Sequence, residues 1–74
     1  MESGLMTIPP QRTSTPVRDL KFGDIVDHQS VGHIVVEVVV TLGTGDLRLY
    51  FMTKHTARPG SLTYTADAKV TVLK

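Results

Sequence analysis

Cysteine and tryptophan are both absent from this 74-residue sequence. Without cysteine, the chain has neither disulfides nor thiolate metal sites, as is common for proteins of a reducing cytosol. A domain of this size buries only about 60% of the surface that its unfolded chain exposes, so small domains usually add a disulfide, a metal or a partner subunit. Of these devices, oligomerisation is the one that we expect here.

The sequence also lacks an excess of charge of either sign and any long apolar run. Eight Lys and Arg residues are interleaved with seven Asp and Glu residues, for a formal net charge of +1. Dedicated nucleic-acid-binding proteins usually have a clear basic excess. No apolar run approaches the roughly 20 residues of a membrane-spanning helix, and the N-terminus has no signal-peptide pattern. We therefore expect a soluble, cytoplasmic protein with no membrane partner.

Residues 1–16 differ in composition from the rest of the chain. Residues 7–16 are rich in Pro, Ser and Thr and contain only isolated apolar residues. Proline removes a backbone donor and fixes φ, so this segment suits neither a helix nor a central strand. We predict a flexible N-terminal arm over residues 1–16 and one folded domain over residues 17–74.

From residue 17 onward the pattern predicts β-strands and leaves no room for a helix of ordinary length. Residues 33–42 are dense in β-branched side chains, which favour a pleated strand over a helix. Glycines 43 and 45 suit a hairpin turn after this strand. Leu20 and Phe22 are expected to point inward from the opening turn. Four further strands are predicted, at residues 25–28, 47–54, 62–65 and 69–73. The prediction is an all-β fold, either a small five-stranded barrel or a strongly bent antiparallel sheet.

Three segments of this pattern are similar to small SH3-like β-barrels. They are residues 20–26, which contain Gly-Asp-Ile-Val, the long strand with its glycine turn, and residues 67–73, which read Asp-Ala-Lys-Val-Thr-Val-Leu. The chain also resembles short uncharacterised proteins of actinobacteria and their phages. The resemblance implies an SH3-like barrel and, if the chain is phage-encoded, a host or virion protein as partner in the host cytoplasm. The aromatic cluster of peptide-binding SH3 domains is missing, because the chain has only two tyrosines and two phenylalanines.

Alternation divides residues 33–42 into two faces. The face predicted to meet the core is entirely apolar and consists of Ile34, Val36, Val38, Val40 and Leu42. The other face is mixed and carries His33 and the four residues Val35, Glu37, Val39 and Thr41. A solvated face should be polar, so the two valines on the mixed face need an explanation. Either the strand bends and buries part of both faces within one chain, or these four residues form a protein interface.

A basic and aromatic strip supports an alternative function. Arg48, Tyr50 and Lys54 share one face of the return strand, and His55 and Arg58 follow in the next loop. Cations can bind phosphate, and the tyrosine ring can stack on a base. The strip therefore predicts either single-stranded nucleic-acid binding or an ordinary solvated surface.

No residue pattern predicts catalysis, a metal site or a cofactor. Asp27 and His28 are neighbours on a strand and point to opposite faces, and the spacing from His28 to His33 matches no metal motif. The serines do not lie in a strand–turn–helix context, and no glycine-rich phosphate loop opens a helix. The sequence predicts a non-enzymatic interaction module that forms a homo-oligomer or binds a host or virion protein.

Overall fold

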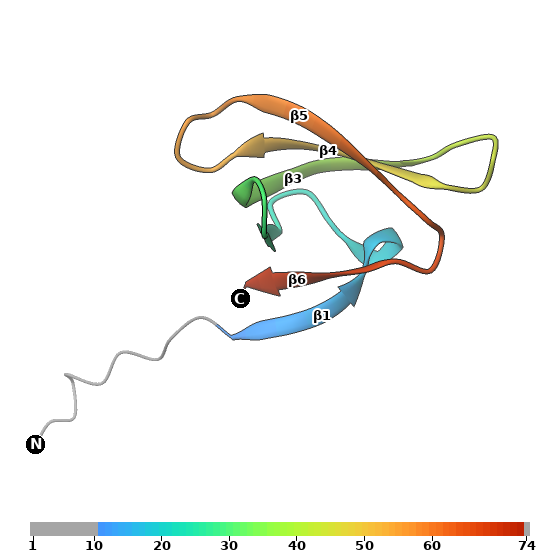
Figure 1. The fold of residues 1–74 in the computed structure, drawn as a ribbon, viewed down its shortest axis with the longest axis horizontal. Helices are drawn as coiled ribbons and strands as arrows, with labels where there is room; N and C mark the ends of the chain where they lie inside the picture. The colour runs from blue at the N-terminus through green and yellow to red at the C-terminus, as the bar shows by residue number, and fades with distance from the viewer. Residues whose placement is uncertain (1–10, 74) are drawn as a thin grey trace, which may run out of the picture.

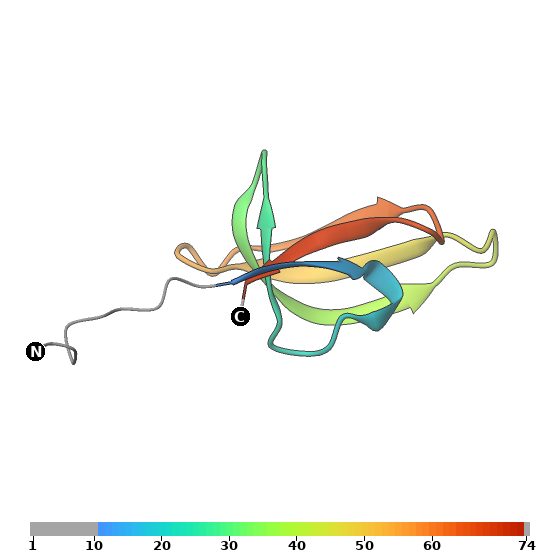
Figure 2. The same ribbon diagram turned by 90° about the horizontal axis from the view of Figure 1, so that it is seen from below.

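The computed structural model describes residues 11–73, which form one antiparallel β-sheet (Figure 1). Its strands are β1 (Arg12–Pro16), β2 (Ile25–His28), β3 (Gly32–Thr41), β4 (Leu47–Thr53), β5 (Pro59–Tyr64) and β6 (Lys69–Leu73). A short 3-10 helix, η2 (Val17–Asp19), separates β1 from β2. The strand order is β1-β6-β2-β3-β4-β5, so β1 and β5 are the edges of a sheet that bends strongly without closing (Figure 2). The prediction of an all-β fold with a bent antiparallel sheet is confirmed.

The sixth strand, β1, lies within the segment that the sequence predicted as a flexible arm. β1 pairs with β6 from Arg12, opposite Leu73, to Pro16, opposite Lys69. A proline is tolerated here because it is the last residue of an edge strand, where no ladder partner needs its missing N–H group. The folded domain therefore extends N-terminally of the boundary predicted at residue 17. The rest of the predicted arm, residues 1–10, lies outside the described residues.

The hydrophobic core lies on one face of the sheet and is completed by the segment around η2. Nine apolar side chains are buried there, namely Val17, Leu20, Val26, Ile34, Val36, Leu47, Leu49, Phe51 and Val72. The η2 segment is fixed against the sheet because the Val17 N–H donates to the Ala68 carbonyl over 3.0 Å. Its position places Val17 and Leu20 in the core, as predicted for Leu20.

Phe22, which was also predicted to point inward, is 82% exposed, so that prediction is wrong. The chain turns immediately after Leu20, where the Asp24 N–H donates to the Lys21 carbonyl over 3.0 Å. The twofold alternation of a strand does not apply to such a turn, and the ring is directed into solvent.

A β-bulge interrupts β3 at Glu37. Val36 pairs with Phe51, and Val38 pairs with Tyr50, the residue that directly adjoins Phe51 on β4. Glu37 is thus an additional residue on β3 with no counterpart on β4. An additional residue bends the strand and moves the residues that follow it to the opposite faces.

The bulge determines which valines of β3 reach the core. Ile34 and Val36 precede it and are fully buried. Beyond it, Val39 packs against the core, whereas Val38 and Val40 are 50% and 41% exposed. The prediction that Val38 and Val40 face the core is therefore wrong, and Val39 is inside because β3 bends.

Candidate interaction surface

The sheet face opposite the core, here called the outer face, carries a row of apolar side chains across five strands. Directly paired residues of antiparallel strands lie on the same face, so the register traces the row. The pairs are Leu73 with Ile25, Ile25 with Val35, Val35 with Met52, and Met52 with Pro59. All but the proline are partly buried by their neighbours. The outer face is therefore apolar at its centre, where a solvated sheet face would be polar.

More exposed apolar side chains adjoin this row beyond the bulge. Val38 and Tyr50 are direct cross-strand partners, and Val40 lies two residues further along β3. Val38, Val40 and Tyr50 are all more than one-third exposed. A single exposed valine is ordinary, but a contiguous group on paired strands is typical of an interaction site. We define the outer patch as Val35, Val38, Val40, Tyr50 and Met52.

The four residues predicted as a protein interface are divided by the structure. Val35 belongs to the outer patch, and Glu37 is exposed at the bulge beside it. Val39 packs against the core. Thr41 is exposed but pairs with buried Leu47, which places it on the core side of the sheet. Strict alternation cannot detect a bulge, although the single acidic residue within a run of valines is a signal that marks this one.

The basic and aromatic residues of the alternative hypothesis lie in two groups. Arg48 and Tyr50 are on the outer face, where the Arg48 Nε–H donates to Thr63 Oγ1 over 3.4 Å. Lys54, His55 and Arg58 are exposed in the connection between β4 and β5. Lys54 follows Arg48 by six positions, which is about 20 Å along an extended strand. The structure thus collects Lys54, His55 and Arg58 at one end of the sheet and leaves Arg48 at the other.

A charged cluster lies on the outer face next to the apolar row. Asp27 accepts a hydrogen bond from the Arg12 guanidinium and lies 3.8 Å from His33 Nε2. The His33 and His55 rings are 6.3 Å apart between centroids. The Arg12 side chain is largely exposed, whereas Asp27 and His33 are 25% and 38% exposed. Ion pairs near the surface contribute about 0.2–1 kcal/mol to stability. Within residues 11–73, no three His, Asp or Glu side chains converge in a way that could hold a metal ion.

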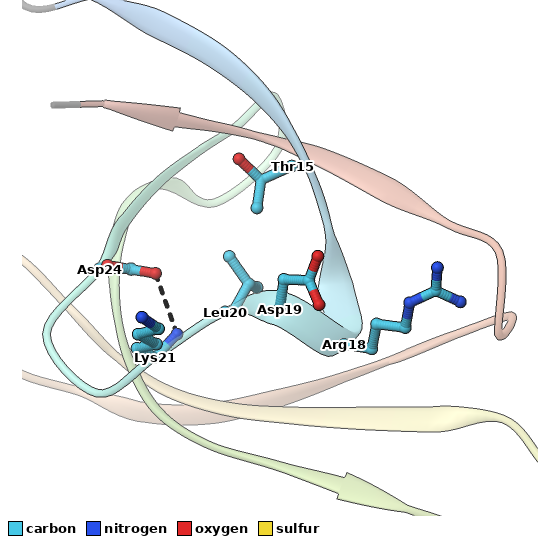
Figure 3. Close-up of a pocket in the computed structure, with 6 residues that line it drawn as sticks. All are labelled: Thr15, Arg18, Asp19, Leu20, Lys21 and Asp24. Carbon is cyan, nitrogen blue, oxygen red and sulfur yellow. Dashed lines mark hydrogen bonds between the residues drawn. The ribbon is translucent and has the colours of Figure 1, made fainter.

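A recess lies beside η2 and the turn that leads into β2 (Figure 3). The residues that line it are Thr15, Arg18, Asp19, Leu20, Lys21 and Asp24. The turn is closed by the Lys21 N–H, which donates to Asp24 Oδ2 over 2.9 Å. In the close-up, the Arg18 side chain extends away from the other five residues. Two acidic and two basic residues surround the recess, so it has no excess charge that would select an ion of either sign.

The chain matches no protein-family model, and no curated protein or solved structure is detectably similar to it. No helix among residues 11–73 is long and apolar enough to cross a membrane. Any functional proposal therefore depends on the four surface features described above, which are the outer patch, the basic and aromatic residues of β4 and the following loop, the charged cluster and the recess. Of these, the outer patch has the composition that most clearly departs from a solvated surface.

Proposed function

We propose that this protein is a non-enzymatic interaction module that self-associates through the outer patch. The observation that carries the proposal is the exposure of Val38 and Val40 beside Tyr50 on hydrogen-bonded strands. The centres of protein interfaces are rich in aromatic and aliphatic side chains and poor in charge. Because the β-ladder already fixes the backbone, and valine has few rotamers, binding at this patch would order few additional groups.

A second copy of the chain is the partner that the small size of the domain favours. Within residues 11–73 the core consists of only nine buried side chains, and the chain has no cysteine to form a disulfide. Packing two outer patches against each other would add apolar burial that a single chain lacks. An apolar patch is complementary to itself, as a twofold contact between identical subunits requires. A host or virion protein on the same patch is the competing occupant.

Sedimentation equilibrium of the full chain tests this proposal. We expect the unmodified protein to associate and the double variant Val38→Lys/Val40→Lys to associate much more weakly, because two ammonium groups would have to be buried at the contact. The matched control is Gln29→Lys/Ser30→Lys, which adds the same charge to exposed positions in the β2–β3 turn. A monomeric unmodified protein at high micromolar concentration would overturn self-association. It would leave another protein as the occupant of the patch.

Single-stranded nucleic acid is the second candidate ligand, on the basis of the two cationic groups along β4. Arg48 and Tyr50 lie on one face, and Lys54 and Arg58 are exposed beyond the end of the strand. Glu37 opposes this function, because its exposed carboxylate repels phosphate. It directly precedes Val38, which is the cross-strand partner of Tyr50. For this reason we rank nucleic-acid binding below self-association.

Fluorescence anisotropy of a labelled single-stranded oligonucleotide at low salt separates the two candidates. A nucleic-acid-binding surface predicts affinity that falls with rising salt and is weakened by Arg48→Ala or Lys54→Ala. Arg18→Ala, which removes an exposed cation outside this surface, is the control. Unchanged anisotropy at low salt would contradict nucleic-acid binding.

A further inference from the structure

Phe22 is the most exposed large apolar side chain among the described residues. It lies on a turn whose backbone is fixed by the Lys21–Asp24 hydrogen bonds and by the Gly23 N–H, which donates to the Val36 carbonyl over 2.9 Å. Gly23 has a φ of +91°, a conformation that side-chain-bearing residues rarely adopt. The ring is therefore presented on a rigid support. A contact made by a side chain on such a support loses little backbone entropy.

The recess described above adjoins this turn, but Phe22 does not line it. Lys21 and Asp24, which flank Phe22 closely in the sequence, do line it. Leu20, which is 8% exposed, supplies a small apolar surface, and Lys21 supplies a cation that can lie over an aromatic ring. The chain thus presents an exposed phenylalanine next to a recess that could hold an aromatic ring. Phe22 of the same chain does not occupy that recess.

We infer that this turn is a second self-association contact, in which Phe22 of each copy enters the recess of another copy. The charges around the recess favour a second copy over a different partner. Arg18 and Lys21 are balanced by Asp19 and Asp24, so a twofold contact can place each cation of one copy near a carboxylate of the other. A strongly acidic or strongly basic partner would be repelled by half of these groups.

This inference rests on the proposed self-association and extends it to a larger assembly. The outer patch and the Phe22 turn share no residue. When one chain has two different twofold contacts, each copy joins two others, and dimers combine into larger species. The outer patch would form the dimer, and the Phe22 contact would join dimers together.

Sedimentation velocity of the full chain over a concentration series tests the second contact. We expect dimers and larger species for the unmodified protein. Phe22→Ser should weaken the step beyond the dimer by about tenfold or more, since exposed aromatic anchors dominate such contacts. Val31→Ser is the matched control, because Val31 is also an exposed apolar residue on a turn, and it should leave the distribution unchanged. Thermal unfolding of Phe22→Ser should match that of the unmodified protein, because the ring is outside the core.

A mixing experiment isolates the charges at the contact, in the Val38→Lys/Val40→Lys background that blocks the outer patch. Arg18→Glu alone and Asp19→Lys alone should each associate less than this background. An equal mixture of the two should associate better than either, because each altered charge then meets its complement. A mixture that associates no better than its components would contradict the charge pairing that selects a second copy.

The outcomes separate this inference from the proposed function. If the unmodified protein and Phe22→Ser both stop at the same dimer, the second contact is overturned and the outer patch stands. If Phe22→Ser is a monomer while Val38→Lys/Val40→Lys still associates, the Phe22 contact stands and the outer patch fails. If every chain is a monomer, both proposals fail.

Discussion

The two halves of β3, residues 32–36 and 38–41, are both rich in β-branched residues, and yet their even-numbered residues lie on opposite faces of the sheet. In the first half Val36 is buried in the core, and in the second half Val38 and Val40 are exposed on the outer face. One additional residue, Glu37, separates the two halves. The difference shows that a run of β-branched residues specifies a strand without specifying which side chains it buries.

The halves also differ in how many neighbours they have. The first half pairs with β2 on one side and with β4 on the other. From Val38 to Thr41, the described pairing of β3 is with β4 alone. The first half is thus the centre of the sheet, whereas the second half has one free edge and an exposed apolar face. Stability should therefore depend mainly on the first half, and association on the second.

The largest expected effect is a difference in stability between truncations in the two halves. Ile34→Ala removes a fully buried side chain before the bulge and should lower the free energy of unfolding by about 2–5 kcal/mol. Val40→Ala truncates an exposed side chain after the bulge and should cost less than about 1 kcal/mol. Urea denaturation of dilute protein measures both. Equal losses would contradict the change of face at the bulge.

A charge scan across the bulge tests the change of face directly. Val39→Asp brings a carboxylate against the core and should cost about 1–3 kcal/mol. Val38→Asp places the same group on the exposed face and should cost less than about 1 kcal/mol. Uninterrupted alternation predicts the opposite order, with Val38 inside. Thermal or urea unfolding of the two variants therefore decides whether the bulge is present.

These two tests also separate the features of the fold that the sequence alone predicts from those that it does not. Composition and β-branched density predict the all-β class and the position of β3, because those properties act locally. The bulge depends on how β3 fits its neighbours, and the strand at Arg12–Pro16 depends on pairing with β6 at the far end of the chain. Such tertiary pairing has no local signature.

The candidate site follows the same division. Tyr50 and Val35 are outward-facing under simple alternation and were accessible from the sequence. Simple alternation places Val38 and Val40 in the core, because it runs across the bulge without a break. Phe22 departs from its predicted position for a related reason, since a turn does not have the period of a strand.

Gly60 on β5 tests the packing of the core beside the first half of β3. Val36 pairs with Phe51, and Phe51 pairs with Gly60, where an added Cβ atom would lie 2.6 Å from Phe51 Cζ. Gly60→Ala should therefore displace a buried ring and cost about 1–3 kcal/mol. Gly43→Ala, at a glycine with open space around it and no positive φ, is the control and should change stability little. If both variants unfold at the same urea concentration, the ring does not pack on Gly60.

The smallest expected effect concerns Tyr64, which lies across from Leu47 beside the second half of β3. Its hydroxyl oxygen is buried and has no hydrogen-bond partner among the described residues. Tyr64→Phe removes this unsatisfied group and should leave stability unchanged or raise it by up to about 1 kcal/mol at pH 7. Tyr50→Phe, which removes a more exposed hydroxyl, should change it by less than about 0.5 kcal/mol.

The same hydroxyl also predicts a dependence of stability on alkaline pH. Burial raises the pKa of Tyr64 above its ordinary value of 10.0, because the phenolate would be poorly solvated. The unfolded chain therefore releases this proton at a lower pH than the folded chain does. Stability from this group is complete below pH 10.0 and is lost as the pH rises toward the raised pKa of the folded state. Urea unfolding at pH 7 and above pH 10 should show that the advantage of Tyr64→Phe over the unmodified protein grows with pH. A constant difference between the two would mean that the hydroxyl is solvated in the folded chain, and that the sheet beside the second half of β3 is more open than the buried oxygen indicates.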